Sequence, residues 1–185
     1  NADVSITPAS GVYQFNDLTI TEGSYLNYKY TVSTSDIDQR FIIPNDSVDT
    51  TTLTVKVQES SSDSTTNTYT LATGISALDS TSKVYFLQEV EGGRFEVYFG
   101  DGVLGKAVAD GNIIILDYIN TNRDAPNGAS SFTLSGTIGG FSSATITTDS
   151  NASGGTGLES ISSIKYNAPR DYTAQDRAVT AEDYK

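Results

Sequence analysis

The stretch from Phe95 to Ile119 constrains the fold most, because two strand patterns are joined there through glycine-rich turns. In RFEVYF, one face of a predicted strand is apolar and consists of Phe95, Val97 and Phe99. The run NIIILDYI is almost entirely apolar and predicts a strand that is buried on both faces, at the centre of a sheet. Two Asp-Gly pairs between these strands predict turns, at Asp101-Gly102 and Asp110-Gly111.

The rest of the first 150 residues also reads as β-structure. Two segments alternate with a period of two and present one apolar face, formed by Tyr28, Tyr30 and Val32 in one and by Leu53, Val55 and Val57 in the other. Further predicted strands are SGVYQFNDLTIT, RFIIP, TYTLA, KVYFLQEV, SSFTLSG and SSATITT. Gly92-Gly93 suits a tight hairpin turn, and SSSDSTTN predicts a polar turn. We therefore predict a mainly β fold, an antiparallel β-sandwich or barrel-like domain over residues 1–150, with a hairpin region at 92–119.

The C-terminal end has a different character. Residues 151–185 begin with a glycine-rich hinge, and Leu158, Ile161 and Ile164 then share one helical face. This pattern predicts a short helix at about 158–167 that stops before Pro169. Thr180 and Asp183 have the spacing of a capping box for a helix whose body does not follow, and the chain contains no methionine. We therefore expect a fragment whose last residues connect to a following domain.

Charge and composition exclude several classes of function. The formal net charge is -12, which argues against binding to nucleic acid or to anionic membranes, because both need basic surfaces. The chain has no cysteine and no histidine, so disulfide frameworks, zinc–thiolate sites and Ser-His-Asp chemistry are excluded. No cofactor or metal is expected from the sequence.

The segment from Gly100 to Lys106 has the spacing G-x-x-x-x-G-K of a phosphate-binding loop. However, Ala107 stands where that motif places a Ser or Thr hydroxyl for magnesium. A turn and a strand are predicted next, whereas a phosphate loop opens a helix. We therefore interpret the glycines as residues that supply positive φ angles and close packing.

Acidic and aromatic residues suggest two kinds of binding module. Asp36 and Asp38 lie two residues apart, as do Glu89 and Glu91, but no calcium loop of the EF-hand type is spelled, and a solvated acidic surface is the expected alternative. A carbohydrate-binding stripe of Tyr25, Tyr28 and Tyr30 is open to the objection that a regular strand would place Tyr25 and Tyr28 on opposite faces. In the C-terminal tail, Arg177 is either part of a solvated linker or the anchor of a charged strap between domains or subunits.

Two stretches together resemble the baseplate J-like family of contractile-tail phages. The first is GRFEVYFGDGVLGKAVADGNIIILDYINTNRDAPNG, which carries Phe99, Gly100, Asp101, Gly102 and Gly105. The second is GGTGLESISSIKYNAPRDYTAQDRAVTAEDYK, with the pattern R-A-V-T-x-x-D-Y that contains Arg177, Val179, Thr180 and Asp183. In the family, the first group belongs to a β-domain, and the second marks entry into the domain that follows.

The resemblance implies a structural protein and not an enzyme. Members of the family build the wedges of the baseplate in the virion, and neighbouring copies join with other wedge proteins to close a ring around the central hub. A homodimer or ring contact with a second copy is therefore expected, with assembly in the cytoplasm of the bacterial host and without nucleic acid or membrane as partner. The alternative is a β-sandwich module of an adhesin that binds carbohydrate or calcium.

Overall fold

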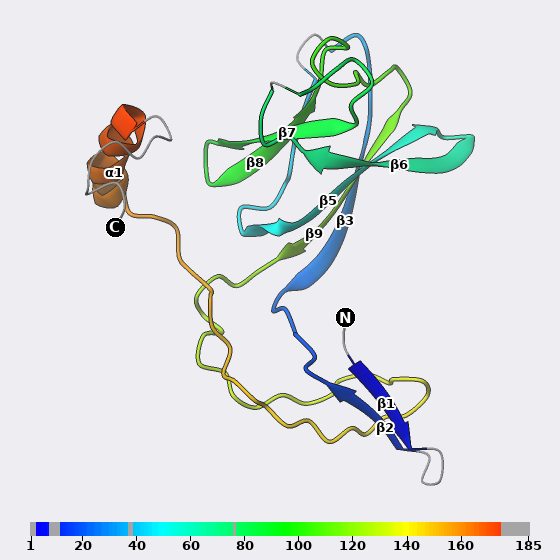
Figure 1. Ribbon diagram of the computed structural model, residues 1–185, viewed down its shortest axis with the longest axis vertical. Helices are drawn as coiled ribbons and strands as arrows, with labels where there is room; N and C mark the ends of the chain where they lie inside the picture. The colour runs from blue at the N-terminus through cyan, green and yellow to red at the C-terminus, as the bar shows by residue number, and fades with distance from the viewer. Residues whose placement is uncertain (1–2, 8–11, 37–38, 76, 175–185) are drawn as a thin grey trace. The chain divides into compact units, whose positions relative to one another are not determined.

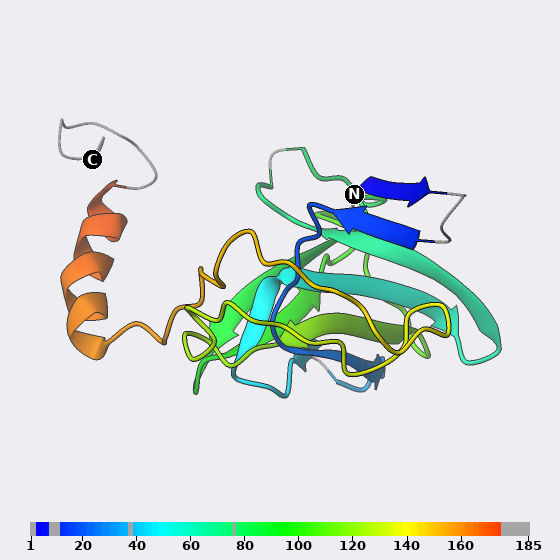
Figure 2. The same ribbon diagram turned by 90° about the horizontal axis from the view of Figure 1, so that it is seen from below.

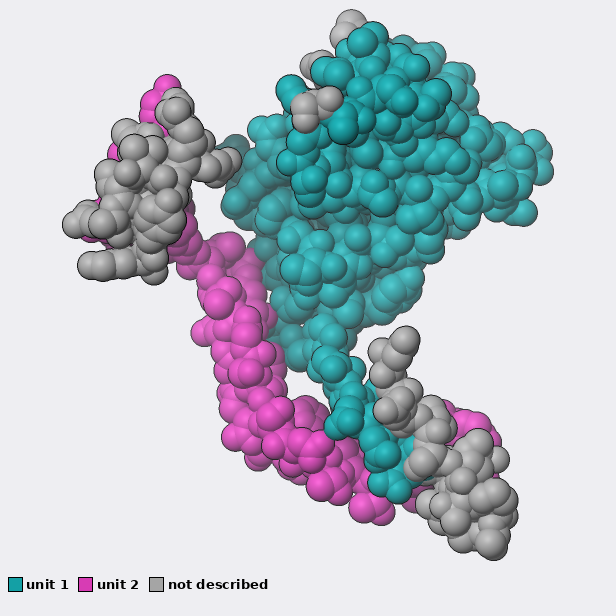
Figure 3. All heavy atoms as spheres, viewed as in Figure 1, with its two compact units in different colours: residues 1–122 teal, residues 123–185 magenta. Residues whose placement is uncertain are grey.

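The computed structural model describes residues 3–7, 12–36, 39–75 and 77–174. The chain divides into two compact units, residues 1–122 and residues 123–185, which are coloured separately in Figure 3. The first unit holds all nine named strands and the second holds the one named helix of the described residues.

The first unit is built around a sheet of seven strands (Figure 1). Its order is β3-β9-β5-β6-β7-β8-β4, and every pair of neighbours is antiparallel except β6 and β7. The strands are β3 (Ser24–Thr31), β4 (Arg40–Ile42), β5 (Val48–Ser60), β6 (Asp63–Leu71), β7 (Val84–Val90), β8 (Arg94–Phe99) and β9 (Ile113–Asn120). A separate antiparallel pair is formed by β1 (Asp3–Thr7) and β2 (Val12–Asn16).

The seven-stranded sheet curls into a nearly closed barrel. Its two end strands, β3 and β4, meet where the Tyr30 hydroxyl donates a 2.5 Å hydrogen bond to the carbonyl oxygen of Ile42. The Tyr30 ring also lies 5.5 Å from the ring of Phe41, so the seam is closed by side chains and not by a strand ladder. The prediction of a mainly β, barrel-like fold with a C-terminal helix is confirmed.

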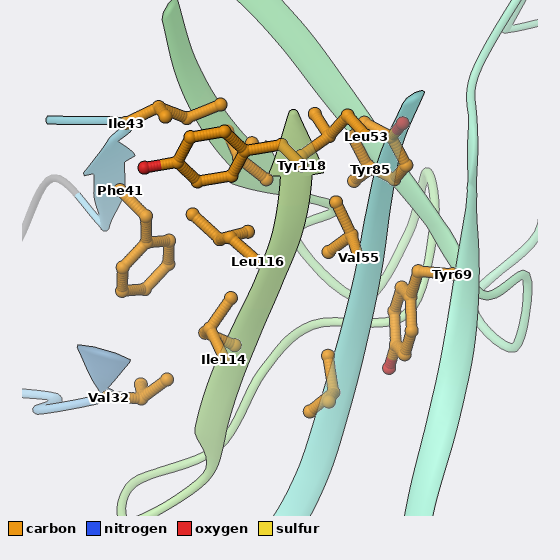
Figure 4. Packing of buried hydrophobic residues seen from close by; sticks show 12 residues of the cluster. Val32, Phe41, Ile43, Leu53, Val55, Tyr69, Tyr85, Ile114, Leu116 and Tyr118 are labelled. Carbon is orange, nitrogen blue, oxygen red and sulfur yellow. The ribbon is translucent and has the colours of Figure 1, made fainter. Parts of the chain in front are cut away.

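The core lies inside the barrel and follows the predicted faces of the strands. Val55 and Val57 of β5 are buried, as is Val97 of β8. Figure 4 shows Ile114, Leu116 and Tyr118 projecting from β9 toward the side where Phe41 and Ile43 lie. On the other face of β9, Ile115 and Asp117 are buried too, which confirms that this strand is covered on both faces. It is flanked by β3 and β5, and so is second in the strand order and not central.

Three local predictions in the barrel and the second unit need correction. The turn predicted for SSSDSTTN is shorter, because β6 already begins at Asp63 and pairs with β5 through Ser60↔Asp63. The segments SSFTLSG and SSATITT form no strand in the structure, and an isolated bridge joins Ile138 and Phe141 in the residues between them. Alternating side chains favour an extended backbone, but a strand also needs a partner ladder, and these segments have none within the described chain.

The helix of the second unit, α1 (Ile161–Ala174), begins and ends later than predicted. It begins after Ser160, whose hydroxyl oxygen accepts a 3.2 Å hydrogen bond from the Ser163 amide and thus caps the first turn. The helix continues through Pro169, which cannot donate a hydrogen bond to the carbonyl four residues earlier. A proline disfavours helical conformation in the residue before it but does not forbid it, and here the helix runs on for five residues beyond Pro169.

Candidate functional site

The candidate site is the glycine loop, residues 100–106, which follows β8 and carries the first family motif. Phe99 ends β8 and anchors the loop to the core, because its ring packs edge-on against Tyr69 at 5.3 Å and against Phe41 at 5.9 Å. The loop and the residues after it lead back into β9 at Ile113. Phe99 is half-buried against the core, and this contact determines where the glycine loop leaves the barrel.

Asp101 organises the loop from within. Its carboxylate accepts hydrogen bonds from the backbone amides of Val103 and Leu104, both at 2.9 Å. The amide of Gly102 donates to the carbonyl of Gly105 at 3.0 Å and closes the same turn. The hydrogen bonds from Leu104 and Val103 lower the pKa of Asp101, because they stabilise its charged form.

The glycines of the loop are required by backbone geometry, as the sequence predicts. Gly102 has a φ of 86° and Gly105 a φ of 93°, a region that residues with a side chain rarely adopt. Gly100 is required for a different reason, because a Cβ atom there would collide with the carbonyl oxygens of Leu104 and Gly105. The loop thus folds back on its own first residue.

A second segment, residues 79–82, binds the C-terminal end of the loop through backbone hydrogen bonds. The amide of Gly105 donates to the carbonyl of Asp79 at 2.9 Å, and the amide of Lys106 donates to the carbonyl of Ser82 at 2.8 Å. This segment belongs to the connection between the parallel strands β6 and β7. No sequence motif connected this segment with the glycine loop, although its pattern D-S-T-S is typical of a turn closed by its own side chains.

Asp79 stabilises that second segment. Its carboxylate accepts bonds from the Thr81 hydroxyl at 2.8 Å and the Thr81 amide at 2.9 Å, and from the Ser82 hydroxyl at 2.9 Å. These bonds, with the Thr81 hydroxyl contributing most, lower the pKa of Asp79 to about 2. Two aspartate-centred turns therefore meet through the backbone of residues 105 and 106.

The hydrogen bonds of the glycine loop are incompatible with a phosphate cradle. The five backbone amides from residue 102 to residue 106 all donate to the protein itself, to Asp101, Gly105, Asp79 and Ser82. A phosphate loop needs these amides free to bind oxygen atoms of the ligand. The Lys106 ammonium lies at the surface, 3.9 Å from the Glu59 carboxylate.

A shallow, open hollow with a volume of about 380 Å³ lies beside the loop. Arg40 is its one cationic lining residue, and its guanidinium pairs with the buried carboxylate of Glu96 and lies 5.1 Å from the centre of the Tyr98 ring. Arg40 therefore already has an anion and an aromatic face as partners. The hollow is lined by Gln39, Arg40, Tyr98, Phe99, Gly100, Asp101, Ala107 and Val108.

The predicted tyrosine stripe is divided between the two faces of β3. Tyr28 packs against Tyr30 with ring centres 5.0 Å apart, on the face that carries Val32. Tyr25 lies on the other face and bonds to Asp117, an interaction that raises the pKa of Tyr25. This confirms that a regular strand separates Tyr25 from Tyr28. In the described part of the chain, no three acidic residues lie close enough together to hold a metal ion.

Comparison with known proteins identifies the family. Residues 28–127 match the family described as "Bacteriophage baseplate wedge protein gp6, third domain". This chain belongs to that family. The match begins within β3, runs past the end of β9 and so includes the glycine loop with Phe99, Gly100, Asp101, Gly102 and Gly105. It thereby places the chain among phage baseplate components.

A curated relative agrees with the family match. The baseplate wedge protein gp6 of Enterobacteria phage T4 is 29% identical over 127 residues, which covers 57% of this chain and 19% of the relative. The chain thus spans about a fifth of that protein's length. The resemblance to phage baseplate wedge proteins inferred from the two sequence motifs is confirmed.

Some of the predicted site residues lie outside the part of the chain that the structure describes. Arg177, Val179, Thr180 and Asp183 lie outside the described residues and beyond the segment that matches the family. Asp38, of the predicted carboxylate pairs, also lies outside the described residues. Among the residues that the structure describes, none of the helices has the length and apolarity needed to cross a lipid bilayer.

Proposed function

We propose that this chain is a structural part of a phage baseplate wedge and acts through protein–protein contacts, without catalysis. The observation that carries the proposal is the family match over residues 28–127, which includes all of β4 to β9. The glycine loop supports it, because its amides and its aspartate stabilise the loop itself and leave no preformed anion site. No observation favours the alternative of a carbohydrate- or calcium-binding adhesin.

The proposed partners are other baseplate wedge proteins and neighbouring copies of this chain, joined in the baseplate ring of the virion. Assembly would take place in the cytoplasm of the host cell. Exposed apolar side chains in the middle of the glycine loop support a role in contacts, since Val103 is 69% and Leu104 is 43% exposed.

We also propose a role for the C-terminal residues. Residues 151–185 would connect the β-rich part, residues 1–150, to a following domain, with Arg177, Val179, Thr180 and Asp183 at the entry to that domain. The support is the resemblance of the R-A-V-T-x-x-D-Y pattern to the second signature of the baseplate J-like family. Limited proteolysis of a longer protein would test it, with cleavage expected near the glycine-rich stretch at 153–157 and not inside the barrel.

Light scattering of the protein with and without the other wedge proteins tests the main proposal. We expect the folded protein to join a wedge complex. Val55→Asp places a charge in the barrel core, where Val55 is fully buried, and should abolish joining together with folding. Thr66→Asp, at an exposed position of β6, is the matched control and should join normally. A folded protein that stays monomeric and joins no wedge complex would contradict the proposal.

A further inference from the structure

The second unit contains a long extended segment that has no strand partner among the residues that the structure describes. Residues 128–152, called the arm below, form two halves that lie alongside each other (Figures 1 and 2). The halves are tied at the base, where the Gly128 amide donates to the Ala152 carbonyl and the Ala152 amide donates to the Ala129 carbonyl, both at 2.8 Å. At the tip, Ile138 and Phe141 exchange two hydrogen bonds around a turn of two glycines with positive φ.

Between base and tip the arm has no ladder. The structure describes every residue of the arm, yet neither half contains a strand or a backbone hydrogen bond to the other half between residues 130 and 137. The sequence is nevertheless patterned as a strand, because Phe132, Leu134 and Ile138 recur at even positions between serines and threonines. Phe132 is 36% exposed and Ile138 is 52% exposed. The arm therefore has a strand pattern, unpaired backbone and uncovered apolar side chains.

The barrel has a free edge of matching length. β3 is the end strand of the sheet and, among the described strands, pairs with β9 alone, over eight residues. The Val32 amide donates a hydrogen bond to the Asn112 carbonyl, so the backbone groups of Val32 point toward the β9 side. Successive residues of a strand direct their amide and carbonyl groups to opposite sides, so those of residues 25, 27 and 29 point toward the free side. The end strand β4 is only three residues long and approaches β3 through Tyr30, which leaves residues 24–29 of the edge uncovered by it.

We propose that the arm of one chain adds as a strand to the free edge of β3 in a second copy of this chain. The inference rests on the proposed function, in which copies of the chain are neighbours in the baseplate. Addition at a sheet edge would satisfy the unpaired backbone of both segments at once. In a reciprocal exchange, each of two copies would add its arm to the β3 edge of the other. Both arms would then be paired, and the contact would have closed two-fold symmetry.

The side chains of the two segments are complementary. With the apolar face of the arm on the inner side of the sheet, Phe132 and Leu134 would lie beside Leu26, which packs against the core, and Tyr28, which is 40% exposed. The outer side would then place the serines and threonines of the arm beside Tyr25, Asn27 and Lys29. A register that reversed the faces would set apolar side chains against this polar set.

Charge favours this arm as the segment that approaches another copy. Residues 131–148 contain no charged side chain, whereas the whole chain carries a formal charge of -12. Two acidic chains repel each other, and an uncharged arm extends contact without adding to that repulsion. The β3 edge carries one charge on its outer face, the cation of Lys29, among Tyr25, Asn27 and Thr31.

Disulfide trapping tests the contact directly, because the chain has no cysteine of its own. A chain with Lys29→Cys is mixed with chains that carry Ser131→Cys, Thr133→Cys or Ser135→Cys, and the mixture is oxidised. We expect a disulfide that joins two chains for at least one of the three arm positions. Lys83→Cys, on an exposed residue just before β7, replaces Lys29→Cys as the matched control and should give no such product.

A proline variant gives a second measurement. Lys29→Pro removes one amide from the free edge of β3 without removing a bond to β9, while Lys29→Ala retains that amide. By sedimentation, wild type and Lys29→Ala should show species of twice the 19.7 kDa chain mass, and Lys29→Pro should remain at the single-chain mass. Circular dichroism establishes that the proline variant is folded.

The outcomes separate this inference from the proposed function. A disulfide within one chain, in a variant with both cysteines, would overturn the assignment to a second copy. Equal self-association of Lys29→Pro and Lys29→Ala, or no disulfide at any arm position, would overturn the β3 edge as the docking site. In both cases the proposed function stands if the chain still joins a wedge complex, and it falls if the chain joins none.

Discussion

At the scale of single residues, Gly100 and Gly102 show two different reasons for a glycine in one turn. Gly102 has a φ of 86°, but a Cβ there would meet nothing closer than Ala107 Cβ at 3.8 Å. Gly100 has no such φ, yet a Cβ there would collide with two carbonyl oxygens of its own loop. Glycine is therefore required at residue 102 by its backbone conformation and at residue 100 by the lack of space for a Cβ atom.

This difference predicts distinct costs of substitution. Gly102→Val should lower the free energy of unfolding by about 1 to 3 kcal/mol through backbone strain. Gly100→Ala should cost about 1 to 3 kcal/mol because the loop backbone must move. Gly74→Ala is the control, since a Cβ at Gly74 meets nothing within 4 Å. Chemical denaturation measures all three, and wild-type stability of Gly102→Val would contradict its turn assignment.

Acid should weaken the structure around the glycine loop through Asp79. The pKa of Asp79 is lowered from its ordinary value of 3.8 to about 2, so folding favours the charged carboxylate. The resulting stabilisation is complete above the ordinary pKa and is lost as the pH falls through the lowered one. Asp79→Asn should therefore reduce the drop in melting temperature between about pH 5 and about pH 2. Glu91→Gln, in the exposed turn after β7, is the control, and an unchanged drop in Asp79→Asn would contradict the role of this carboxylate.

At the scale of the elements, a polar group on the outer face joins three neighbouring strands. Asp117 of β9 is buried, and its carboxylate accepts a 2.6 Å bond from the Asn27 amide of β3 and a 2.9 Å bond from the Lys56 ammonium of β5. Burial by itself raises the pKa of Asp117, but the bonds from Asn27 and Lys56 outweigh burial and lower it. The triad thus holds β3 to the rest of the sheet by side chains as well as by backbone.

Removing one member of this triad should loosen β3. Asn27→Ala takes a donor from a buried carboxylate and should cost about 1 to 3 kcal/mol. It should also raise the pKa of Asp117, which NMR titration of the carboxyl carbon measures. Lys29→Ala, on the same face of β3 and exposed, is the control and should change stability little. An Asn27→Ala chain with unchanged stability and an unchanged pKa of Asp117 would refute the structural role of the triad.

At the scale of the whole molecule, the net charge of -12 opposes contact between copies. If copies associate through the uncharged arm, added salt screens the repulsion and leaves the arm contact intact. Self-association should therefore become stronger from low salt to about 0.5 M salt, as measured by sedimentation equilibrium. Weaker association at high salt would indicate a contact based on ion pairs and would count against the arm.

The sequence predicted those parts of the whole fold that depend on local patterns. Alternation identified the buried faces of β5 and β8, and Gly92-Gly93 marked the turn between β7 and β8, where both glycines have positive φ. The continuous apolar run of β9 indicated burial on both faces. Each of these signals is local, because side chains on the same face of a strand meet the same environment and so share their polarity along the sequence.

Only the tertiary structure decided which segments meet. Three contacts join segments that no local pattern connects. They are the parallel pairing of β6 with β7, the closure of the barrel between Tyr30 and Ile42, and the hydrogen bonds from the glycine loop to residues 79 and 82. SSFTLSG has the alternation of a strand and yet forms no ladder with any described part of the chain. Alternation is a property of one segment, whereas a ladder needs two segments. The free energy of forming a ladder therefore depends on which strand edges the fold leaves open.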